Sequence, residues 1–320
     1  RSVASAGDVN GDGYSDVIVG ANQYDNELTD EGAAFVYHGS ATGINPVAAA
    51  IREGDQLSAR FGRSVSTAGD VNGDGFADVI IGSALFNNDQ TDEGAAFIFH
   101  GSPTGIAATA ASLLEVNQAN AWFGLSVSAA GDVNGDGYAD VIVGAPLYDN
   151  NETNEGLAYV FHGSATGIVT AAATVLEVNQ ANANFGGYVS AAGDVNGDGY
   201  ADVVIGASLY DNGQTDEGVA FVYYGSVTGI NAATSSILEI NQAAAQMGTS
   251  VSGAGDINGD GYSDIVVGAP QYVNGGFLEG GAFVFQGNNP GISLRNNLRL
   301  YNTDLSTPIN SSNFFSDNFG

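Results

Sequence analysis

The sequence predicts an all-β protein, a β-propeller of four-stranded antiparallel blades, on three observations. First, the string Gly-Asp-(Val/Ile)-Asn-Gly-Asp-Gly recurs five times, and its first aspartates stand 62 residues apart at Asp8, Asp70, Asp132, Asp194 and Asp256. Second, every repeat contains four short runs of β-branched, aromatic or small residues bounded by turn formers. Third, glycine is abundant, at 47 of 320 residues, without a collagen-like period. Tandem copies of such a unit bury their sheets by stacking on one another.

The third repeat shows the four predicted strands. They are 123–130 (FGLSVSAA), 140–144 (DVIVG), 157–162 (LAYVFH) and 174–178 (TVLEV). The first run is small enough to suit the crowded centre of a propeller, where the blades converge. No window has a capped apolar stripe of helical period, so we expect little helix.

The repeats divide the chain into five units. We place them at about 1–60, 61–122, 123–184, 185–246 and 247–301. The fifth unit loses the pattern after about Gly287, and residues 302–320 are expected to form an irregular tail that closes or links the array. Five repeats predict either a five-bladed ring or part of a larger propeller or array.

A nine-residue loop joins the first two predicted strands of every unit. It carries side-chain oxygens at positions 1, 3, 5 and 9, a backbone carbonyl at position 7, and a glycine at position 6 that permits a tight turn. Ca²⁺ takes about six to eight oxygen ligands, and the spacing resembles the first half of an EF-hand loop. The predicted ligands are Asp8, Asn10, Asp12, Tyr14, Asp16, Asp70, Asn72, Asp74, Phe76, Asp78, Asp132, Asn134, Asp136, Tyr138, Asp140, Asp194, Asn196, Asp198, Tyr200, Asp202, Asp256, Asn258, Asp260, Tyr262 and Asp264.

The charge balance favours calcium over the alternative of five turns that bond only their own backbone. With 36 acidic residues against six basic ones, the formal net charge is −30, and five bound Ca²⁺ ions would add ten positive charges and leave −20. Three carboxylates in each loop would repel one another without a cation. A surface this acidic also predicts no binding to nucleic acid and no membrane insertion.

The motifs resemble the FG-GAP repeat. Phe-Gly pairs stand at 61–62, 123–124 and 185–186, and Gly-Ala-Pro stands at 144–146 and 268–270, while Met247 replaces the phenylalanine of the fifth pair. This repeat forms the β-propeller of integrin α-subunits and of secreted bacterial proteins, usually with seven blades. The resemblance implies calcium in the loops between strands one and two, on one face of the disc, and a ligand on the opposite face.

The opposite face is expected to carry the loops between strands two and three and those between blades. Candidate ligand residues there are Tyr24, Asp25, Tyr148, Asp149, Tyr210, Asp211 and Trp122. Aromatic rings beside carboxylates and amides suit sugars or peptides. The alternative is structural: acidic side chains such as Glu31 and Glu155 organise the loop, and Trp122 packs on the next blade.

These observations predict a non-enzymatic, extracellular calcium-binding module for adhesion or ligand binding, secreted or at the cell surface. Its partner would be an extracellular protein or a glycan. Two alternatives remain: a structural subunit of a surface layer or filament, which self-associates with neighbouring chains, and a multivalent lectin. An enzyme is disfavoured, because the chain has no cysteine and no lysine and its carboxylates recur equivalently in every repeat.

Overall fold

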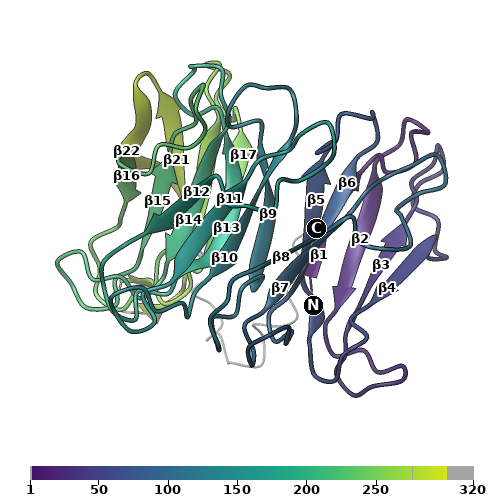
Figure 1. Ribbon diagram of the computed structural model, residues 1–320. Helices are drawn as coiled ribbons and strands as arrows, with labels where there is room; N and C mark the ends of the chain where they lie inside the picture. The colour runs from purple at the N-terminus through teal and green to yellow at the C-terminus, as the bar shows by residue number, and fades with distance from the viewer. Residues whose placement is uncertain (1, 276, 301–320) are drawn as a thin grey trace.

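The computed structural model describes the backbone of residues 2–275 and 277–300. It contains five four-stranded antiparallel blades, as predicted, and no helix among the described residues (Figure 1). Accordingly, nothing in that part of the chain is a helix suited to crossing a membrane. The predicted tail at 302–320 lies outside the described residues.

Strands follow one another across each sheet in chain order. Blade 1 contains β1 (Ser2–Gly7), β2 (Asp16–Ala21), β3 (Ala33–Tyr37) and β4 (Ala50–Glu53). Blade 2 contains β5 (Phe61–Gly69), β6 (Asp78–Ser83), β7 (Ala95–Phe99) and β8 (Ser112–Glu115). Blade 3 contains β9 (Ser126–Gly131), β10 (Asp140–Ala145), β11 (Leu157–Phe161) and β12 (Thr174–Glu177). Blade 4 contains β13 (Phe185–Gly193), β14 (Asp202–Ala207), β15 (Val219–Tyr223) and β16 (Ser235–Leu238).

Blade 5 departs from this pattern in two places. It contains β17 (Ser250–Gly255), β18 (Asp264–Ala269), β21 (Gly281–Asn288) and β22 (Gly291–Leu300). A small hairpin of β19 (Val273–Asn274) and β20 (Phe277–Leu278) occupies the loop between its second and third strands. Only residues 289–290 separate β21 from β22, whereas about a dozen residues join the last two strands in the other blades. The irregularity predicted after Gly287 is therefore a tight hairpin.

The core lies between neighbouring blades rather than inside any one of them. One face of each blade carries small and branched side chains such as Ala130, Ile142 and Leu176, and it packs on the aromatic face of the next blade, which includes Phe185 and Phe221. Four such interfaces join the five blades. Because strand alternation gives each sheet two apolar faces, only stacking can remove both from water.

The Phe-Gly pair links each blade to the one before it. The backbone N–H of Phe123 donates to the carbonyl of Glu93 at 2.9 Å, and the Phe123 ring packs edge-on against Tyr159, with the ring centroids 5.6 Å apart. The side chains at this position, Met247 included, are buried in blades 2 to 5. The exchange of phenylalanine for methionine therefore keeps the apolar anchor.

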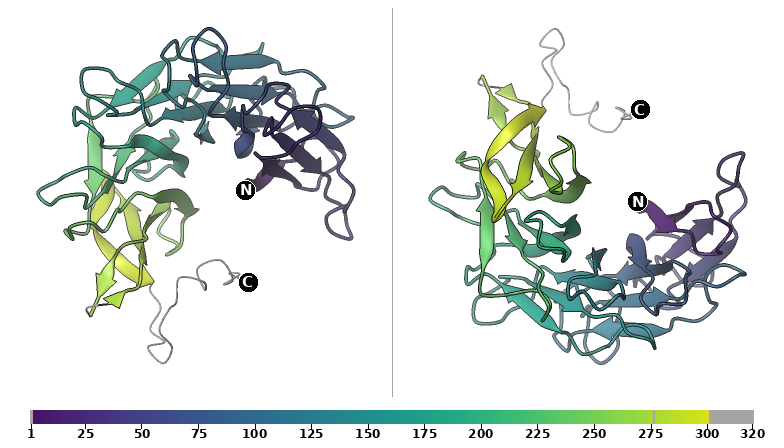
Figure 2. Two further views of the ribbon diagram at one scale, coloured as in Figure 1. Left: turned by 90° about the horizontal axis from the view of Figure 1, so that it is seen from below. Right: turned by 90° about the horizontal axis from the view of Figure 1, so that it is seen from above.

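The five blades form an open arc over the described residues, with the first strands β1, β5, β9, β13 and β17 along its inner side (Figure 2). Blade 1 and blade 5 lie at the two ends of the arc with a gap between them (Figure 2). Of the two architectures predicted, the described residues form a partial propeller and not a closed five-bladed ring.

Candidate calcium loops and the opposite face

The nine-residue loops lie between the first and second strands of every blade, as predicted. In blade 3 the loop leaves β9, whose last residue is Gly131, and its position 9, Asp140, is the first residue of β10. Gly135 and Gly137 have φ angles of 73° and 92°, a region that favours glycine. These two residues let the chain curl within a single loop.

The loop closes around the carboxylate at position 1. Asp132 Oδ1 accepts the backbone N–H groups of Gly135 (2.7 Å) and Asp136 (3.1 Å), and Oδ2 accepts that of Gly137 (2.9 Å). Asn134 Nδ2 donates to Asp136 Oδ2 at 2.9 Å. The side chains at positions 1, 3 and 5 therefore share one loop and are organised by its own amide groups, an arrangement that the other four blades repeat.

Position 9 has a role that the sequence alone did not reveal. Asp140 is fully buried, and its two oxygens accept the backbone N–H groups of Val133 (2.8 Å) and Gly163 (2.9 Å). This carboxylate therefore ties the loop to the connection that follows the third strand. A carboxylate with both oxygens so engaged can still offer further lone pairs to a cation.

Burial makes the negative charge at position 9 costly. Desolvation raises the pKa of Asp78 and Asp140 to about 6 and that of Asp202 to about 7, against the lowering by two backbone hydrogen bonds on each carboxylate. The pKa of Asp256, at position 1 of the last loop, is lowered instead. Hydrogen bonds from backbone N–H groups, chiefly that of Gly261, cause this shift. A cation beside position 9 would favour the ionised form of the aspartate at that position.

The donor set of the loops fits calcium in its chemistry: carboxylate, amide and carbonyl oxygens, and no nitrogen or sulfur. Within the described part of the chain, no three His, Cys, Asp or Glu side chains gather closely enough to hold a metal ion. The loop carboxylates face backbone amide groups instead. The calcium ligands therefore stay a prediction, and their binding would turn carboxylate oxygens from amide groups toward the ion.

The candidate tyrosines of the opposite face pack against their own blades. Tyr24 meets Phe35 edge-on at 5.6 Å, Tyr148 meets Tyr159 at 6.2 Å, and Tyr210 meets Phe221 at 5.4 Å between ring centroids. Tyr148 and Tyr210 flank the hydrophobic core. These rings have a structural role in the blade, and their part in ligand binding stays a prediction.

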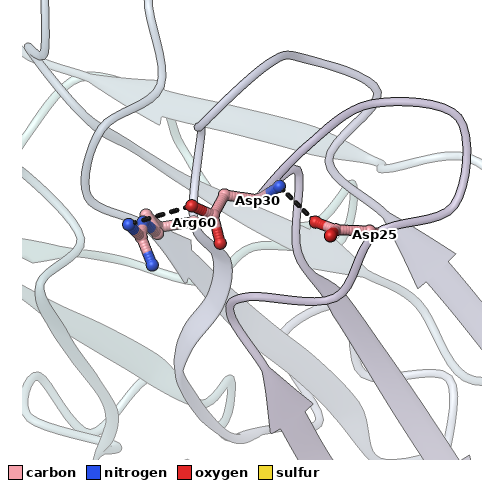
Figure 3. Close-up of polar contacts among 3 residues, drawn as sticks. All are labelled: Asp25, Asp30 and Arg60. Atoms are coloured by element: carbon pink, nitrogen blue, oxygen red, sulfur yellow. Dashed lines mark hydrogen bonds and ion pairs between the residues drawn. The ribbon is translucent and has the colours of Figure 1, made fainter.

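The candidate aspartates beside them organise a loop. Asp25 Oδ1 accepts the backbone N–H of Asp30 at 2.5 Å, and Asp30 pairs at 3.2 Å with Arg60 of the connection to the next blade (Figure 3). Asp149 and Asp211 accept the corresponding N–H groups in blades 3 and 4. These contacts agree with the structural alternative for this face.

One glutamate of this loop is buried in each of blades 1 to 4: Glu31, Glu93, Glu155 and Glu217. Glu155 Oε1 accepts the N–H groups of Asn150 (2.8 Å) and Asn151 (2.9 Å), as the loop-organising hypothesis expected. The second carboxylate oxygen, Oε2, is buried with no hydrogen-bond partner in Glu93, Glu155 and Glu217.

A comparison with known families matches the five blades one by one. The FG-GAP repeat matches residues 1–37, 61–99, 123–161, 186–223 and 247–282, which is more than half of the chain. The chain belongs to the FG-GAP repeat family. Its blades correspond to the repeats, and the predicted resemblance is confirmed.

Integrin α-subunits are among the relatives of this FG-GAP chain. It is 33% identical to rat integrin alpha-7 over 158 residues, which are 49% of this chain and 13% of that subunit. It is also 35% identical to chicken integrin alpha-6 over 161 residues, 50% of this chain and 14% of that subunit, and 35% identical to chicken integrin alpha-V over 161 residues, 48% of this chain and 15% of that subunit. The FG-GAP chain thus spans about a seventh of the length of these relatives.

Among solved structures, the exotype rhamnogalacturonan lyase YesX aligns with 94% of the FG-GAP chain and 65% of its own chain, at 12% identity and a TM-score of 0.42. At this sequence identity and TM-score, the alignment carries no argument about function.

Trp122 lies in the connection between the second and third FG-GAP blades. Its side chain is 36% exposed and its φ is 55°, and Arg60, Asn184 and Gln246 have similar positive φ values at the same repeat position. The backbone conformation is therefore set by the repeat, and the exposed indole is particular to this one place. Its role in ligand contact stays a prediction.

A hollow between blades 1 and 2 was missed by the sequence analysis. It has a volume of about 660 Å³, and four phenylalanines line it: Phe61, Phe86, Phe97 and Phe99. The sequence signal was a break in the repeat, because Arg52 and Gly54 stand where the next blade carries the buried Leu114 and Val116.

Arg52 is held at the wall of this hollow. Its Nε and Nη2 donate to the carbonyls of Ala107 and Ile106, both at 2.8 Å, and its guanidinium carbon lies 5.9 Å from the centre of the Phe99 ring. Burial lowers the pKa of Arg52 from its usual value. Glu53 and Asp55 add two carboxylates to the lining.

Proposed function

We propose that this FG-GAP chain is a calcium-stabilised, non-enzymatic ligand-binding module that acts outside the cell. The observation that carries the proposal is the fivefold recurrence of one loop, with Asp, Asn and Asp side chains at positions 1, 3 and 5, on a propeller related to integrin α-subunits. Calcium at millimolar concentration, as extracellular fluids contain it, keeps even weak sites of this kind filled.

Calcium is the cation that the charges favour. The chain carries a formal charge of −30, and each loop has a buried carboxylate at position 9, an exposed one at position 5 and one at position 1 that is partly buried in blades 1 to 4. Divalent cations bound in the loops offset this repulsion and stabilise the folded state over the unfolded one. The proposed cofactor content is about five Ca²⁺ per chain.

Binding is favoured over catalysis because the carboxylates of the loops are hydrogen-bonded to the backbone and have the same surroundings in successive blades. The aspartates of the nine-residue loops and the glutamates of the opposite loops accept backbone N–H groups in blade after blade. A catalytic pair of carboxylates needs two different environments, one that favours the acid and one that favours the base. The repeats supply the same environment several times.

We place the ligand at the hollow between blades 1 and 2. Its phenylalanines offer an apolar base, and Glu53 and Asp55 offer negative charge beside them. This combination suits a protein segment with a basic side chain next to an apolar one. The hollow depends on Arg52 and Gly54, which occur in blade 1 only, so a single protein contact is favoured over the several equivalent sites of a lectin.

The calcium proposal is tested by melting the metal-free chain with EGTA, with millimolar Ca²⁺ and with millimolar Mg²⁺. We expect Ca²⁺ to raise the Tm and Mg²⁺ to do so much less, since each site filled at a hundred times its Kd adds about 2.7 kcal/mol. Identical melts in EGTA and Ca²⁺, with metal analysis showing no bound calcium, would mean that the loops are turns satisfied by their own amides.

The ligand proposal is tested with peptide and glycan arrays and the variant Arg52→Leu. This substitution gives blade 1 the leucine that Leu114, Leu176 and Leu238 provide elsewhere, so we expect the fold to remain and the hollow to fill. Binding of basic-apolar peptides should fall at least tenfold, while Val227→Gln, at an exposed position of blade 4 outside the lining of the hollow, serves as the control variant. Binding of multivalent glycans that Arg52→Leu leaves intact would favour the lectin instead.

A further inference from the structure

The two ends of the arc expose faces that are buried everywhere else. We define the leading face as the surface of blade 1 that contains Val3, Tyr14 and Ile44, and the trailing face as the surface of blade 5 that contains Ile257 and Gly259. Each internal interface joins a face of the trailing kind to a face of the leading kind. At the ends of the arc neither face has a neighbouring blade among the described residues (Figure 2).

The leading face has the apolar side chains of an internal interface, but these side chains are exposed. Val3 is 71% exposed, whereas its counterparts one, two and three repeats later, Val65, Val127 and Val189, are 5–6% exposed. Ile44 is 49% exposed, whereas the same position in the next three repeats, Ile106, Ile168 and Ile230, is 5–6% exposed. These side chains therefore have the chemistry of a core position and the exposure of a surface one.

The trailing face shows the same contrast. Ile257 is 57% exposed, whereas the four residues at the same position of the preceding loops, Val9, Val71, Val133 and Val195, have no exposed surface. In those loops the next blade covers the side chain. Blade 5 presents an equally apolar residue, and no blade formed by residues 2–275 and 277–300 lies over it.

Each internal interface also contains a ring that packs over a glycine. The position 7 ring of one loop covers the position 4 glycine of the preceding loop: a Cβ on Gly135 would lie 2.7 Å from Tyr200 Cε1. The contact recurs between Phe76 and Gly11, Tyr138 and Gly73, and Tyr262 and Gly197. At the ends, the ring of Tyr14 is 44% exposed, and nothing lies within 4 Å of a Cβ on Gly259.

Two backbone hydrogen bonds complete every internal interface. The N–H of Ala139 donates to the carbonyl of Asp70 at 3.0 Å, and that of Ser164 donates to the carbonyl of Val71 at 3.1 Å. The pair recurs between each of the other neighbouring blades. Among the described residues, the corresponding donors of blade 1, Ser15 and Ser40, and the corresponding acceptors of blade 5, Asp256 and Ile257, lack this bond.

The two end faces are therefore complementary halves of one interface. The leading face supplies the ring and the donors, and the trailing face supplies the open glycine and the acceptors. We propose that the trailing face of a second copy of this chain docks on the leading face, so that copies associate head to tail. Such a contact is heterologous, because each copy contributes a different surface to it.

The docked contact is expected to be weaker than an internal interface. Two separate copies lose translational and rotational freedom when they dock, a cost that neighbouring blades of one chain do not have. We therefore expect a Kd on the order of micromolar rather than nanomolar. Association of this kind depends on protein concentration and continues beyond the dimer, since every dimer leaves one free face at each end.

Sedimentation velocity across roughly 1 to 100 μM protein tests the proposal, with calcium present throughout. The variants are Val3→Gln on the leading face and Ile257→Gln on the trailing face, which leave the net charge unchanged. The control is Val227→Gln, a valine that is 74% exposed in blade 4 and belongs to neither end face. Thermal melts establish that all three variants are folded.

We expect the wild type and Val227→Gln to form species larger than a dimer as concentration rises. Val3→Gln and Ile257→Gln should each stay monomeric alone, and an equal mixture of the two should form a one-to-one dimer that grows no further. A wild type that is monomeric throughout would overturn the proposal. So would either single variant that still dimerises by itself, because that would indicate a symmetric contact. Neither result depends on whether the ligand proposal holds.

Discussion

Blade 3 and blade 1 have closely similar sequences and the same strand order, but they differ in how much of each sheet is buried. All six residues of β10 in blade 3 are buried, whereas in β2 of blade 1 buried and partly exposed residues alternate. Within the described part of the chain, blade 3 lies between two neighbours and blade 1 has a neighbour on one side only (Figure 2). The difference shows that a blade of this repeat is stable through its neighbours rather than through a core of its own.

The largest expected effect on stability comes from one isoleucine position of the repeat, tested in blade 3 and in blade 1. Ile168→Ala removes a side chain that is 6% exposed in the core between blades 2 and 3, and we expect it to lower the free energy of unfolding by about 2–5 kcal/mol. Ile44→Ala removes the equivalent side chain of blade 1, which is 49% exposed. This variant should change the free energy of unfolding by about 0.5 kcal/mol or less. Urea unfolding of dilute protein measures both.

Equal losses for the two isoleucine variants would show that the leading face is covered in solution even at low concentration. A repeat of the Ile44→Ala measurement at high concentration separates cover by a second copy from cover within one chain, because only the former depends on concentration.

A smaller difference is expected between two glycines of the calcium loops. Gly135 and Gly259 have φ angles of 73° and 76°, so alanine at either position should cost about 1–2 kcal/mol from backbone strain. At Gly135 the new methyl group also meets the Tyr200 ring, which should add about 1–3 kcal/mol, whereas Gly259 faces open space. Urea unfolding in EGTA isolates this packing difference from any change in calcium binding, and similar losses would contradict the proposed stacking of rings on glycines.

A further expected effect is the pH dependence of stability that the three interior blades cause. Burial raises the pKa of Asp78 and Asp140 to about 6 and of Asp202 to about 7, above the ordinary value near 3.9 in the unfolded chain. The folded state then holds more protons than the unfolded state between these values, so this contribution to stability is full below about pH 4 and is lost as the pH rises through 6 to 7. The Tm of metal-free protein should therefore fall between pH 5 and pH 7.5.

Two controls sharpen the pH experiment. Added salt screens the repulsion among surface charges but not the cost of burial, so the fall in Tm should persist at about 0.5 M NaCl. Saturating Ca²⁺ should reverse the trend, because protons compete with calcium for the carboxylates. A metal-free Tm that rises with pH would show that the position 9 aspartates are ionised in the folded state without a cation.

Much of the fold could be predicted from the sequence because the repeat is nearly perfect. The 62-residue step, the four short runs and the Phe-Gly pairs predict the number of strands, their order and their approximate bounds: the runs 140–144 and 157–162 became β10 and β11 within a residue of each end. Register is strongly constrained in such strands, since a slip of one residue would turn the apolar face of each sheet outward.

The sites were only partly predictable. The spacing of Asp132, Asn134 and Asp136 predicted that they share one curled loop, which the hydrogen bonds show. It could not predict that Asp140 accepts the N–H of Gly163, because that residue lies a whole hairpin away along the chain. Nor could it predict the hollow at Arg52, since the effect of a lost leucine depends on how the next blade packs against the gap.

The sequence by itself determined the local structure of this protein. Alternation, β-branched runs and positive-φ glycines act over a few residues, so they specify strands, turns and two apolar faces for every blade. Only the tertiary structure decided which of those faces are buried. Burial requires a neighbour that the residues of one blade do not encode, and for this reason Val127 lies in a core while Val3, in the same motif of blade 1, is 71% exposed.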